Sequence, residues 1–350
     1  MKNYIKFLGI ILMAAIIALA FTACVIEPEE PIPDEPIPGG EQPGGGQTPG
    51  NMTWTAVADS KFGGSAIYDI TYGGGKFVAV GSGGKMAYSI NGITWTAVTN
   101  STFGNSSISG IAWGNDKFVA VGSGGKMAYS TDGIIWTAVT DSTFGTDDYF
   151  NGITCIAYGG GKFVAGGYYD MAYSTDGVTW TAVEVINSGS GIYCIAYGGG
   201  KFVAVGSVGK MKYSADGVTW TAVTDSTFGT NNINGIAYGG GKFVAGDSYG
   251  KMAYSTDGIT WKAVADSKFG GNIDGIAYGG GKFVAVGVNG KVAYSTDGVT
   301  WTAVGDGILG KDSPTNAPPG FEMLIRINAI AYGGNRWVAV GGSGKMAYSD

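Results

Sequence analysis

From residue 51 onwards the chain alternates short apolar runs with turns rich in glycine. In one representative unit the apolar runs span residues 275–278, 282–286, 291–295 and 300–304. The Gly279-Gly280-Gly281 and Asp297-Gly298 turns between them favour tight hairpins, because glycine adopts positive φ without strain. Large aromatic residues alternate with alanine along the runs, as in sheets that stack face to face. The pattern therefore predicts four short antiparallel strands per unit and no helix.

This unit recurs seven times. The run that resembles Trp-Thr-Ala-Val begins at Trp54, Trp95, Trp136, Trp180, Trp220, Trp261 and Trp301. These positions are 40 to 44 residues apart. A period near 40 residues with several strands per unit is typical of the blades of a β-propeller.

The two ends of the repeat region complement each other. The region begins with a fourth strand at 52–57 and ends with a third strand at 345–349. Pairing these strands would complete one blade and leave no sheet edge open. We therefore predict an all-β, seven-bladed β-propeller of four-stranded antiparallel blades. Its seventh blade takes strands one to three from 327–349 and strand four from 52–57.

The N-terminus has the features of an export signal. A basic start at residues 1–6 precedes the apolar run 7–23, which ends in small residues before Cys24. This junction resembles the lipobox of bacterial lipoproteins, which implies a signal peptide at 1–23 and a lipid on Cys24. The expected location is a bacterial membrane, outer membrane or cell surface, reached through this lipid anchor. The alternative is an uncleaved membrane anchor.

Residues 24–50 form the next segment. They contain seven prolines, six acidic residues and no periodic apolar face. Such a composition favours an extended, solvated chain, so this segment is predicted to be a tether. The expected organisation is thus signal peptide 1–23, tether 24–50 and propeller 51–350.

Composition excludes several classes of function. The chain has no histidine, so mechanisms that need imidazole are excluded. Its net charge of −6 argues against a nucleic-acid partner. Cys155 and Cys194 occupy matching positions in neighbouring units. They are predicted either to form a disulfide or to be two small buried thiols.

The turn before each fourth strand carries a recognisable motif. Residues 173–180 read Tyr-Ser-Thr-Asp-Gly-Val-Thr-Trp, which resembles the Asp-box, or BNR, repeat of sialidase-like propellers. In blade one, Asn91 replaces the aspartate. The predicted structural residues of this motif are Ser130, Asp132, Trp136, Ser174, Asp176, Trp180, Ser214, Asp216, Trp220, Ser255, Asp257, Trp261, Ser295, Asp297 and Trp301.

The chemistry of the motif is structural. Its aspartate is expected to accept backbone N–H bonds across the turn, and its tryptophan to be buried. One carboxylate per turn is too few oxygens for a calcium ion, so neither a metal nor a cofactor is expected. The resemblance to sialidases would imply three arginines around a carboxylate. Only Arg326 and Arg336 are present, so sialidase activity is not expected.

Candidate ligand contacts are sought where the copies differ, because near-identical repeats are scaffold. Blade three has a longer incoming loop and an aromatic turn between its second and third strands, and an insertion at 305–326 enters blade seven. The candidates are Asp147, Asp148, Tyr149, Phe150, Tyr168, Tyr169, Asp170, Asp247, Tyr249, Phe321 and Arg326. Exposed aromatic residues beside acids suit a sugar or a peptide. The alternative is a divergent loop that only covers the channel mouth.

The predicted function is a non-enzymatic, membrane-anchored platform that binds a protein or a carbohydrate. A multivalent lectin with one site per blade is the alternative. A glycoside hydrolase is the third possibility, although no carboxylate pair is singled out by the sequence.

Overall fold

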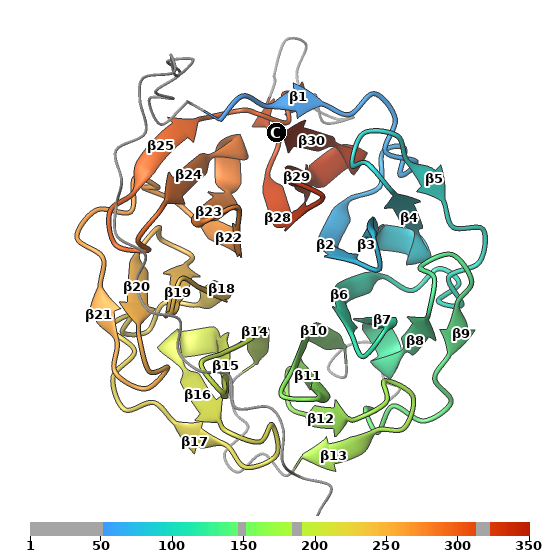
Figure 1. Ribbon diagram of the computed structural model, residues 1–350, viewed down its shortest axis with the longest axis horizontal. Helices are drawn as coiled ribbons and strands as arrows, with labels where there is room; N and C mark the ends of the chain where they lie inside the picture. The colour runs from blue at the N-terminus through green and yellow to red at the C-terminus, as the bar shows by residue number, and fades with distance from the viewer. Residues whose placement is uncertain (1–51, 146–151, 184–190, 313–322) are drawn as a thin grey trace, which may run out of the picture. The chain divides into compact units, whose positions relative to one another are not determined.

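A computed structural model describes residues 52–145, 152–183, 191–312 and 323–350. Seven four-stranded antiparallel sheets stand in a ring around a common axis (Figure 1). The predicted fold, an all-β propeller with seven blades, is confirmed. Each sheet lies edge-inward, with its first strand nearest the axis and its fourth strand at the rim.

The strands have the same lengths in almost every blade. The innermost strands are β2 (Ile67–Gly73), β6 (Ile108–Gly114), β10 (Ile153–Gly159), β14 (Ile192–Gly198), β18 (Ile233–Gly239), β22 (Ile273–Gly279) and β28 (Ile327–Gly333). The second strands are β3 (Lys76–Gly81), β7 (Lys117–Gly122), β11 (Lys162–Gly167), β15 (Lys201–Gly206), β19 (Lys242–Asp247), β23 (Lys282–Gly287) and β29 (Arg336–Gly341). The third strands are β4 (Met86–Ser89), β8 (Met127–Ser130), β12 (Met171–Ser174), β16 (Met211–Ser214), β20 (Met252–Ser255), β24 (Val292–Ser295) and β30 (Met346–Ser349).

The outermost strands are shorter than the sequence pattern predicts. They are β1 (Thr55–Ala56), β5 (Thr96–Ala97), β9 (Thr137–Ala138), β13 (Thr181–Val183), β17 (Thr221–Ala222), β21 (Lys262–Ala263) and β25 (Thr302–Gly305). A tryptophan directly precedes each of these outer strands and lies outside it. Its ring turns inward to pack between blades, as that of Trp95 does, with only 2% of the residue exposed. A short additional hairpin, β26 (Lys311–Asp312) with β27 (Met323–Leu324), belongs to the insertion before blade seven.

The predicted closure of the ring is present. Strand β1 pairs with β30, with Thr55 opposite Tyr348 and Ala56 opposite Ala347. The amide of Val57 donates to the Met346 carbonyl at 2.9 Å. The continuous blade one has the same bond, from the amide of Val98 to the Met86 carbonyl, also at 2.9 Å. The split blade therefore has the same pairing as a blade whose four strands are continuous in sequence.

Successive blades contact each other closely at the inner strands. The glycine that ends each inner strand lies under an aromatic ring of the following blade, so that a Cβ on Gly73 would lie 2.0 Å from the Trp113 ring. The same contact joins the last blade to the first, where a Cβ on Gly333 would lie 1.9 Å from the Tyr72 ring. The buried apolar residues form seven clusters, each shared by two neighbouring blades. Most of the core therefore lies between the sheets.

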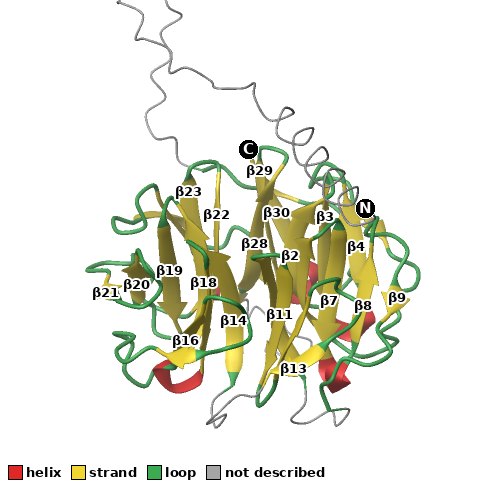
Figure 2. Ribbon diagram, turned by 60° about the horizontal axis from the view of Figure 1, so that its bottom comes forward, coloured by secondary structure: helices red, strands yellow, loops and turns green. Residues whose placement is uncertain are grey.

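One face of the ring carries the connections between blades and the turns between second and third strands. Five of these turns are single 3₁₀ turns, which lie together on one side in Figure 2. They are η1 (Ser82–Gly84), η2 (Ser123–Gly125), η3 (Ser207–Gly209), η4 (Val288–Gly290) and η5 (Gly342–Gly344). The hydroxyl of Ser101, in a connection between blades, donates to the carbonyl of Gly84 in η1 at 2.6 Å. Such bonds attach the connections to the turns.

The turns that resemble the Asp-box lie between third and fourth strands, on the opposite face, and their aspartates bind the backbone of the turn as expected. In blade four the Asp216 carboxylate accepts the amides of Val218 and Thr219 at 2.8 Å and the hydroxyl of Ser214 at 2.9 Å. The serine oxygen in turn accepts the Gly217 amide at 2.8 Å. These amide bonds to Asp216 lower the pKa of its carboxyl to about 2, against the opposing effect of burial.

Closure can be tested by deletion. Removing residues 52–57 would expose the edge of β30 and remove Met52 and Trp54 from the core between blades six and seven. We expect the unfolding transition, followed by circular dichroism in urea, to lose its cooperativity or to move to markedly lower urea concentration. A deletion of equal length at 44–49, in the proline- and glycine-rich segment, is the matched control. Equal transitions for the two deletions would contradict closure.

The Asp-box can be tested by two substitutions at one position. Blade one carries Asn91, whose side-chain oxygen accepts the same two amides at 2.9 Å. We therefore expect Asp216→Asn to preserve stability near neutral pH, whereas Asp216→Ala should cost about 1–3 kcal/mol through unsatisfied donors.

The same pair of variants reports the pH dependence. The Asp216 carboxyl has a lowered pKa in the folded state, so its ionised form stabilises the fold above the ordinary value of 3.8. This contribution should be lost as the pH falls from about 4 to about 2. The native protein should therefore become less stable than Asp216→Asn over that range, so that the difference between their unfolding free energies, near zero at neutral pH, opens as the pH falls, measured by urea unfolding at each pH. A constant difference would contradict the assignment.

Candidate functional site

Every inner strand begins with a β-bulge. In each blade the register against the second strand shifts between the first and third residues, so that the middle residue has no partner across the ladder. Bulges redirect a side chain out of the regular alternation. The bulged residues are Tyr68, Ser109, Thr154, Tyr193, Asn234, Asp274 and Asn328.

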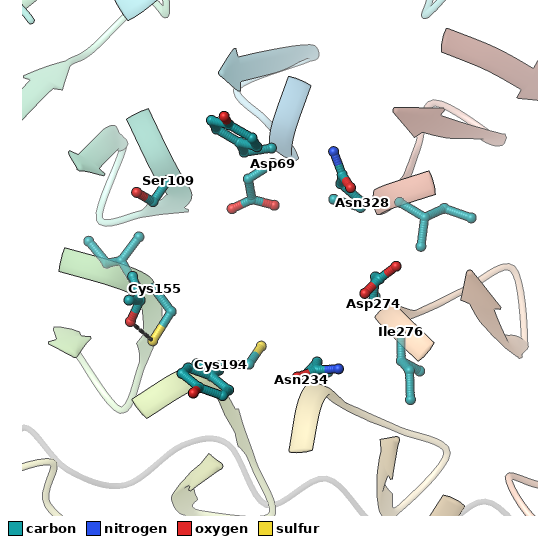
Figure 3. A pocket seen from close by; sticks show the side chains of 16 residues that line it. Asp69, Ser109, Cys155, Cys194, Asn234, Asp274, Ile276 and Asn328 are labelled. Carbon is teal, nitrogen blue, oxygen red and sulfur yellow. Dashed lines mark hydrogen bonds between the residues drawn. The ribbon is translucent and has the colours of Figure 1, made fainter. Parts of the chain in front are cut away.

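These residues line a cavity at the centre of the ring. It has a volume of about 160 Å³ and is lined by residues from all seven blades. The residues that follow the bulges also line the cavity, among them Asp69, Cys155 and Cys194 (Figure 3). The Asp69 carboxylate points into the open centre in this view. The channel is thus the place where otherwise similar blades present different chemical groups.

Polar side chains of the channel connect neighbouring blades. The Asn328 amide donates to the Ile67 carbonyl of blade one at 2.7 Å, and the Asn234 amide donates to the Ile273 carbonyl at 3.3 Å. The hydroxyl of Thr154 makes the equivalent bond to the Ile192 carbonyl. Each donor meets the first residue of the next inner strand, so these bulged residues fix the spacing of the blades.

Asp274 stands at the equivalent position in blade six, but a carboxylate cannot donate such a bond. It accepts instead both Nε and a terminal nitrogen of Arg326, the residue just before the inner strand of blade seven. Asn272 adds a bond to the same carboxylate at 2.9 Å. Only 7% of the Asp274 side chain is exposed. The hydrogen bond with Asp274 raises the pKa of Arg326, so the guanidinium stays charged and neutralises the carboxylate.

Asp69 is held differently. Its two oxygens accept the amides of Ile70 at 2.8 Å and of Ile111, in the next blade, at 2.9 Å. Burial raises the pKa of its carboxyl to about 7, although both amide bonds oppose this shift. No cationic residue is among those that line the cavity.

The two cysteines of the channel are free. The Cys155 thiol lies 3.9 Å from the Gly166 carbonyl, and the Cys194 thiol lies 4.0 Å from the Ile236 carbonyl. Burial raises the pKa of both thiols, that of Cys194 to about 11. They are therefore neutral groups at ordinary pH. Both are free in the structure, Cys155 buried and Cys194 partly buried, which agrees with the predicted pair of thiols more than with a disulfide.

The aromatic turn of blade three reaches the channel. Tyr168 and Tyr169 are 44% and 47% exposed, and the turn is closed by the Gly167 amide donating to the Asp170 carbonyl at 2.9 Å. The ring of Tyr168 lies edge-on to that of Tyr193, with 6.3 Å between centroids. Because Tyr193 is a channel residue, Tyr168 is continuous with the cavity wall. We call Tyr168, Tyr169 and Tyr193, on blades three and four, the tyrosine cluster.

Two of the sequence candidates have structural partners. Asp247, predicted as a ligand contact, is fully buried. Its carboxylate accepts the amides of Tyr249 and Lys251 at 2.8 and 2.7 Å and the side chain of Asn231 at 2.6 Å. Because these bonds occupy the carboxylate inside its own turn, Asp247 is not available at the surface, and that expectation is corrected. Arg326 is half-exposed but paired with Asp274 as described above.

The remaining candidates divide into two groups. Tyr249 is exposed on the turn of blade five, two blades from Tyr168 and Tyr169 along the ring. Asp147, Asp148, Tyr149, Phe150, Phe321 and Cys24 lie outside the described residues.

Sequence reasoning missed the channel residues as a group. The signal was available, because the residue two places before each Ile-Ala-Tyr-Gly-like segment varies among the copies while the segment itself hardly changes. Within the described ranges, no three His, Cys, Asp or Glu side chains gather as metal ligands. The same ranges contain no helix long and apolar enough to cross a membrane.

Comparison with known proteins establishes the fold. No protein-family model matches the chain. No curated protein matches it either. Among solved structures, the chain resembles YCF48 from Cyanidioschyzon merolae with a TM-score of 0.62 and 19% identity, over 85% of this chain and 98% of that one.

Two lyases show the same architecture. Virginiamycin B lyase from Staphylococcus aureus matches with a TM-score of 0.64 and 13% identity, over 85% of this chain and 98% of that one. A streptogramin B lyase matches with a TM-score of 0.68 and 11% identity, over 86% of this chain and 98% of that one. The chain therefore has a seven-bladed propeller fold that it shares with binding proteins and with enzymes.

Proposed function

We propose that this chain is a non-enzymatic, membrane-anchored binding platform whose ligand, a protein or a glycan, covers the channel mouth at blades three and four. The contact between Tyr168 and Tyr193 carries this proposal. It joins exposed aromatic surface to the channel, where the blades present different chemical groups. Tyrosine rings suit this role, since they offer a large apolar face with a polar tip.

The solved structures support a protein ligand. YCF48, which has this fold, has been solved bound to the D1 peptide, and the WD40 domain of Doa1 is another similar propeller. The likeness to these proteins is confined to the fold, so the ligand of the present chain is argued from its own tyrosine cluster.

Catalysis is disfavoured by the channel chemistry. A catalytically inactive variant of virginiamycin B lyase has a histidine replaced by alanine, whereas the present chain has no histidine. The two channel carboxylates, Asp69 and Asp274, are the best candidates for a hydrolase pair. Both oxygens of Asp274 are bonded to Arg326, which leaves that carboxylate poorly placed to act as a nucleophile or base.

The lectin alternative requires equivalent sites on all blades. The near-identical outer surfaces, including the repeated Asp-box turns related to BNR repeats by resemblance, favour it. The channel argues against a lectin with equivalent sites, because the seven bulged residues in it are of five different residue types. Stoichiometry separates the two functions: about one ligand per chain supports the platform and about seven support the lectin.

The tyrosine cluster can be tested with arrays of glycans and of cell-surface proteins, probed with the full chain. For a ligand found there, Tyr168→Ala combined with Tyr169→Ala should weaken binding by about tenfold or more, because two aromatic contacts are removed. Tyr249→Ala is the matched control, an exposed tyrosine on the same face. Equal affinities for the native chain and the double variant, measured by calorimetry, would contradict the site.

Membrane anchoring is proposed from the N-terminal sequence, in which a basic start and an apolar run precede Cys24. Expressed in a bacterium, the native chain should partition into the detergent phase and the membrane fraction. Cys24→Ser should move it to the soluble, exported fraction, because one lipidated residue supplies the anchor. Cys155→Ser is the matched control. An unchanged membrane fraction for Cys24→Ser would favour the uncleaved apolar anchor instead.

A further inference from the structure

The charges on the channel wall do not balance. Among the described residues that line the cavity, the only two with a carboxyl group are Asp69 and Asp274. Asp274 is neutralised by Arg326 in a two-point ion pair. Asp69 therefore contributes an uncompensated negative charge whenever it is ionised.

None of the described residues that line the cavity with Asp69 is a cation that could serve as its partner. From the inner strand β6 of blade two, Ser109 faces the cavity, and from β28 of blade seven Asn328 and Ala329 do so. Across the cavity lie Cys155 and Cys194, whose thiols are neutral because burial raises their pKa. The arrangement fixes an anion in a poorly hydrated wall, where a cation from outside would interact more strongly than in bulk water.

The geometry distinguishes between kinds of cation. Each oxygen of Asp69 already accepts one backbone amide, from Ile70 and from Ile111. A guanidinium binds a carboxylate best as a planar fork across both oxygens, which these amides partly occupy. An ammonium group is a compact charge that needs only one remaining lone pair. The site therefore favours an ammonium over a guanidinium.

Aromatic rings border the approach to this carboxylate. Tyr68 precedes Asp69 in the chain and is 39% exposed, and Tyr193 lines the same cavity and contacts Tyr168. Tyrosine faces attract ammonium groups and pack well against an unbranched methylene stem. A cavity of about 160 Å³ admits such a stem but little more.

We propose that the channel receives a lysine side chain of a polypeptide ligand, with Asp69 as the counter-ion of its ammonium group and the tyrosine cluster around its stem. This inference rests on the proposed function and deepens it. It makes the ligand a protein and places one basic side chain of that protein on the propeller axis.

The test uses the full chain and three small probes followed by NMR titration. They are N-acetyl-lysine N-methylamide, its neutral isostere N-acetyl-norleucine N-methylamide, and Nα-trimethyl-norleucine N-methylamide, whose quaternary α-ammonium is charged at every pH. At about pH 8.5 Asp69 is ionised, and the lysine probe should bind at least about tenfold more tightly than the neutral isostere. At about pH 5.5 the carboxyl is protonated, and this preference should fall to about twofold or less.

Variants of Asp69 supply the control. Asp69→Asn should abolish the preference for the charged probe at high pH, and Asp69→Glu, which keeps the charge, should restore most of it. The lysine probe should also lower the pKa of the Asp69 carboxyl, seen directly by carbon NMR. If Asp69→Asn does not fold, the pH series and this titration on the native chain still decide the matter.

The contrary outcomes are separable. Equal binding of the charged and neutral probes, or stronger binding of the α-ammonium probe, would overturn the lysine site. The proposed platform would survive that result if an array ligand still depended on Tyr168 and Tyr169. Absence of any array ligand together with absence of probe binding would overturn both.

Discussion

The structure depends on seven blades being held at one fixed spacing. That spacing is set where the glycine at the end of each inner strand meets the aromatic ring of the next blade, as Gly73 meets Trp113 and Gly333 meets Tyr72. A side chain at any of these glycines would overlap the ring, so the contact allows only one separation. The last of these contacts joins the first and last blades, and the pairing of β1 with β30 secures it at the rim. Closure thus follows from the same local geometry seven times over, and it gives β30 a neighbouring strand on both sides, as in every other blade.

Fixed spacing frees the innermost positions for other uses. Once the Gly–aromatic contacts and the shared clusters hold the blades, the bulged residues need not be alike. At three junctions they still donate to the next blade, from Thr154, Asn234 and Asn328. Tyr68 and Tyr193 stand at the same position with aromatic rings instead, on either side of blades two and three. The aromatic part of the wall therefore adjoins two of these junctions, since Tyr68 follows Ile67 and Tyr193 follows Ile192, the residues whose carbonyls accept the bonds.

Much of the fold could be predicted from the sequence, because the repeats carry the information redundantly. The repeat region begins with a fourth strand after Trp54 and ends with a third strand at Ser349. This arrangement predicts a blade split between the two ends, and the structure contains it. The outer strands were expected to be longer, because a strand pattern does not show that Trp301 and its equivalents leave the ladder to pack between blades. Asp247 was expected at the surface, because sequence does not show that a carboxylate is enclosed by amides of its own turn. The channel residues went unnoticed for a related reason: a bulge reverses the side of one residue, and alternation along a strand does not predict where this occurs.

Asp69 and the Asp-box aspartates show how one residue type serves opposite ends of the same blade. In the Asp-box turn of blade four, two amides and a hydroxyl converge on one carboxylate near solvent, and they lower the pKa of Asp216. In the channel, two amides also bind Asp69, but burial outweighs them and raises its pKa to about 7. Asp216 also accepts bonds from the side chains of Ser214 and Thr219, whereas Asp69 has only its two amide bonds and is far more buried, so hydrogen bonding and hydration together separate the two pKa values. A carboxyl that titrates near neutrality is suited to exchange a proton for a cationic ligand, whereas one that remains ionised is suited to hold a turn. Burial therefore separates the scaffold acids from the one acid that the channel keeps available.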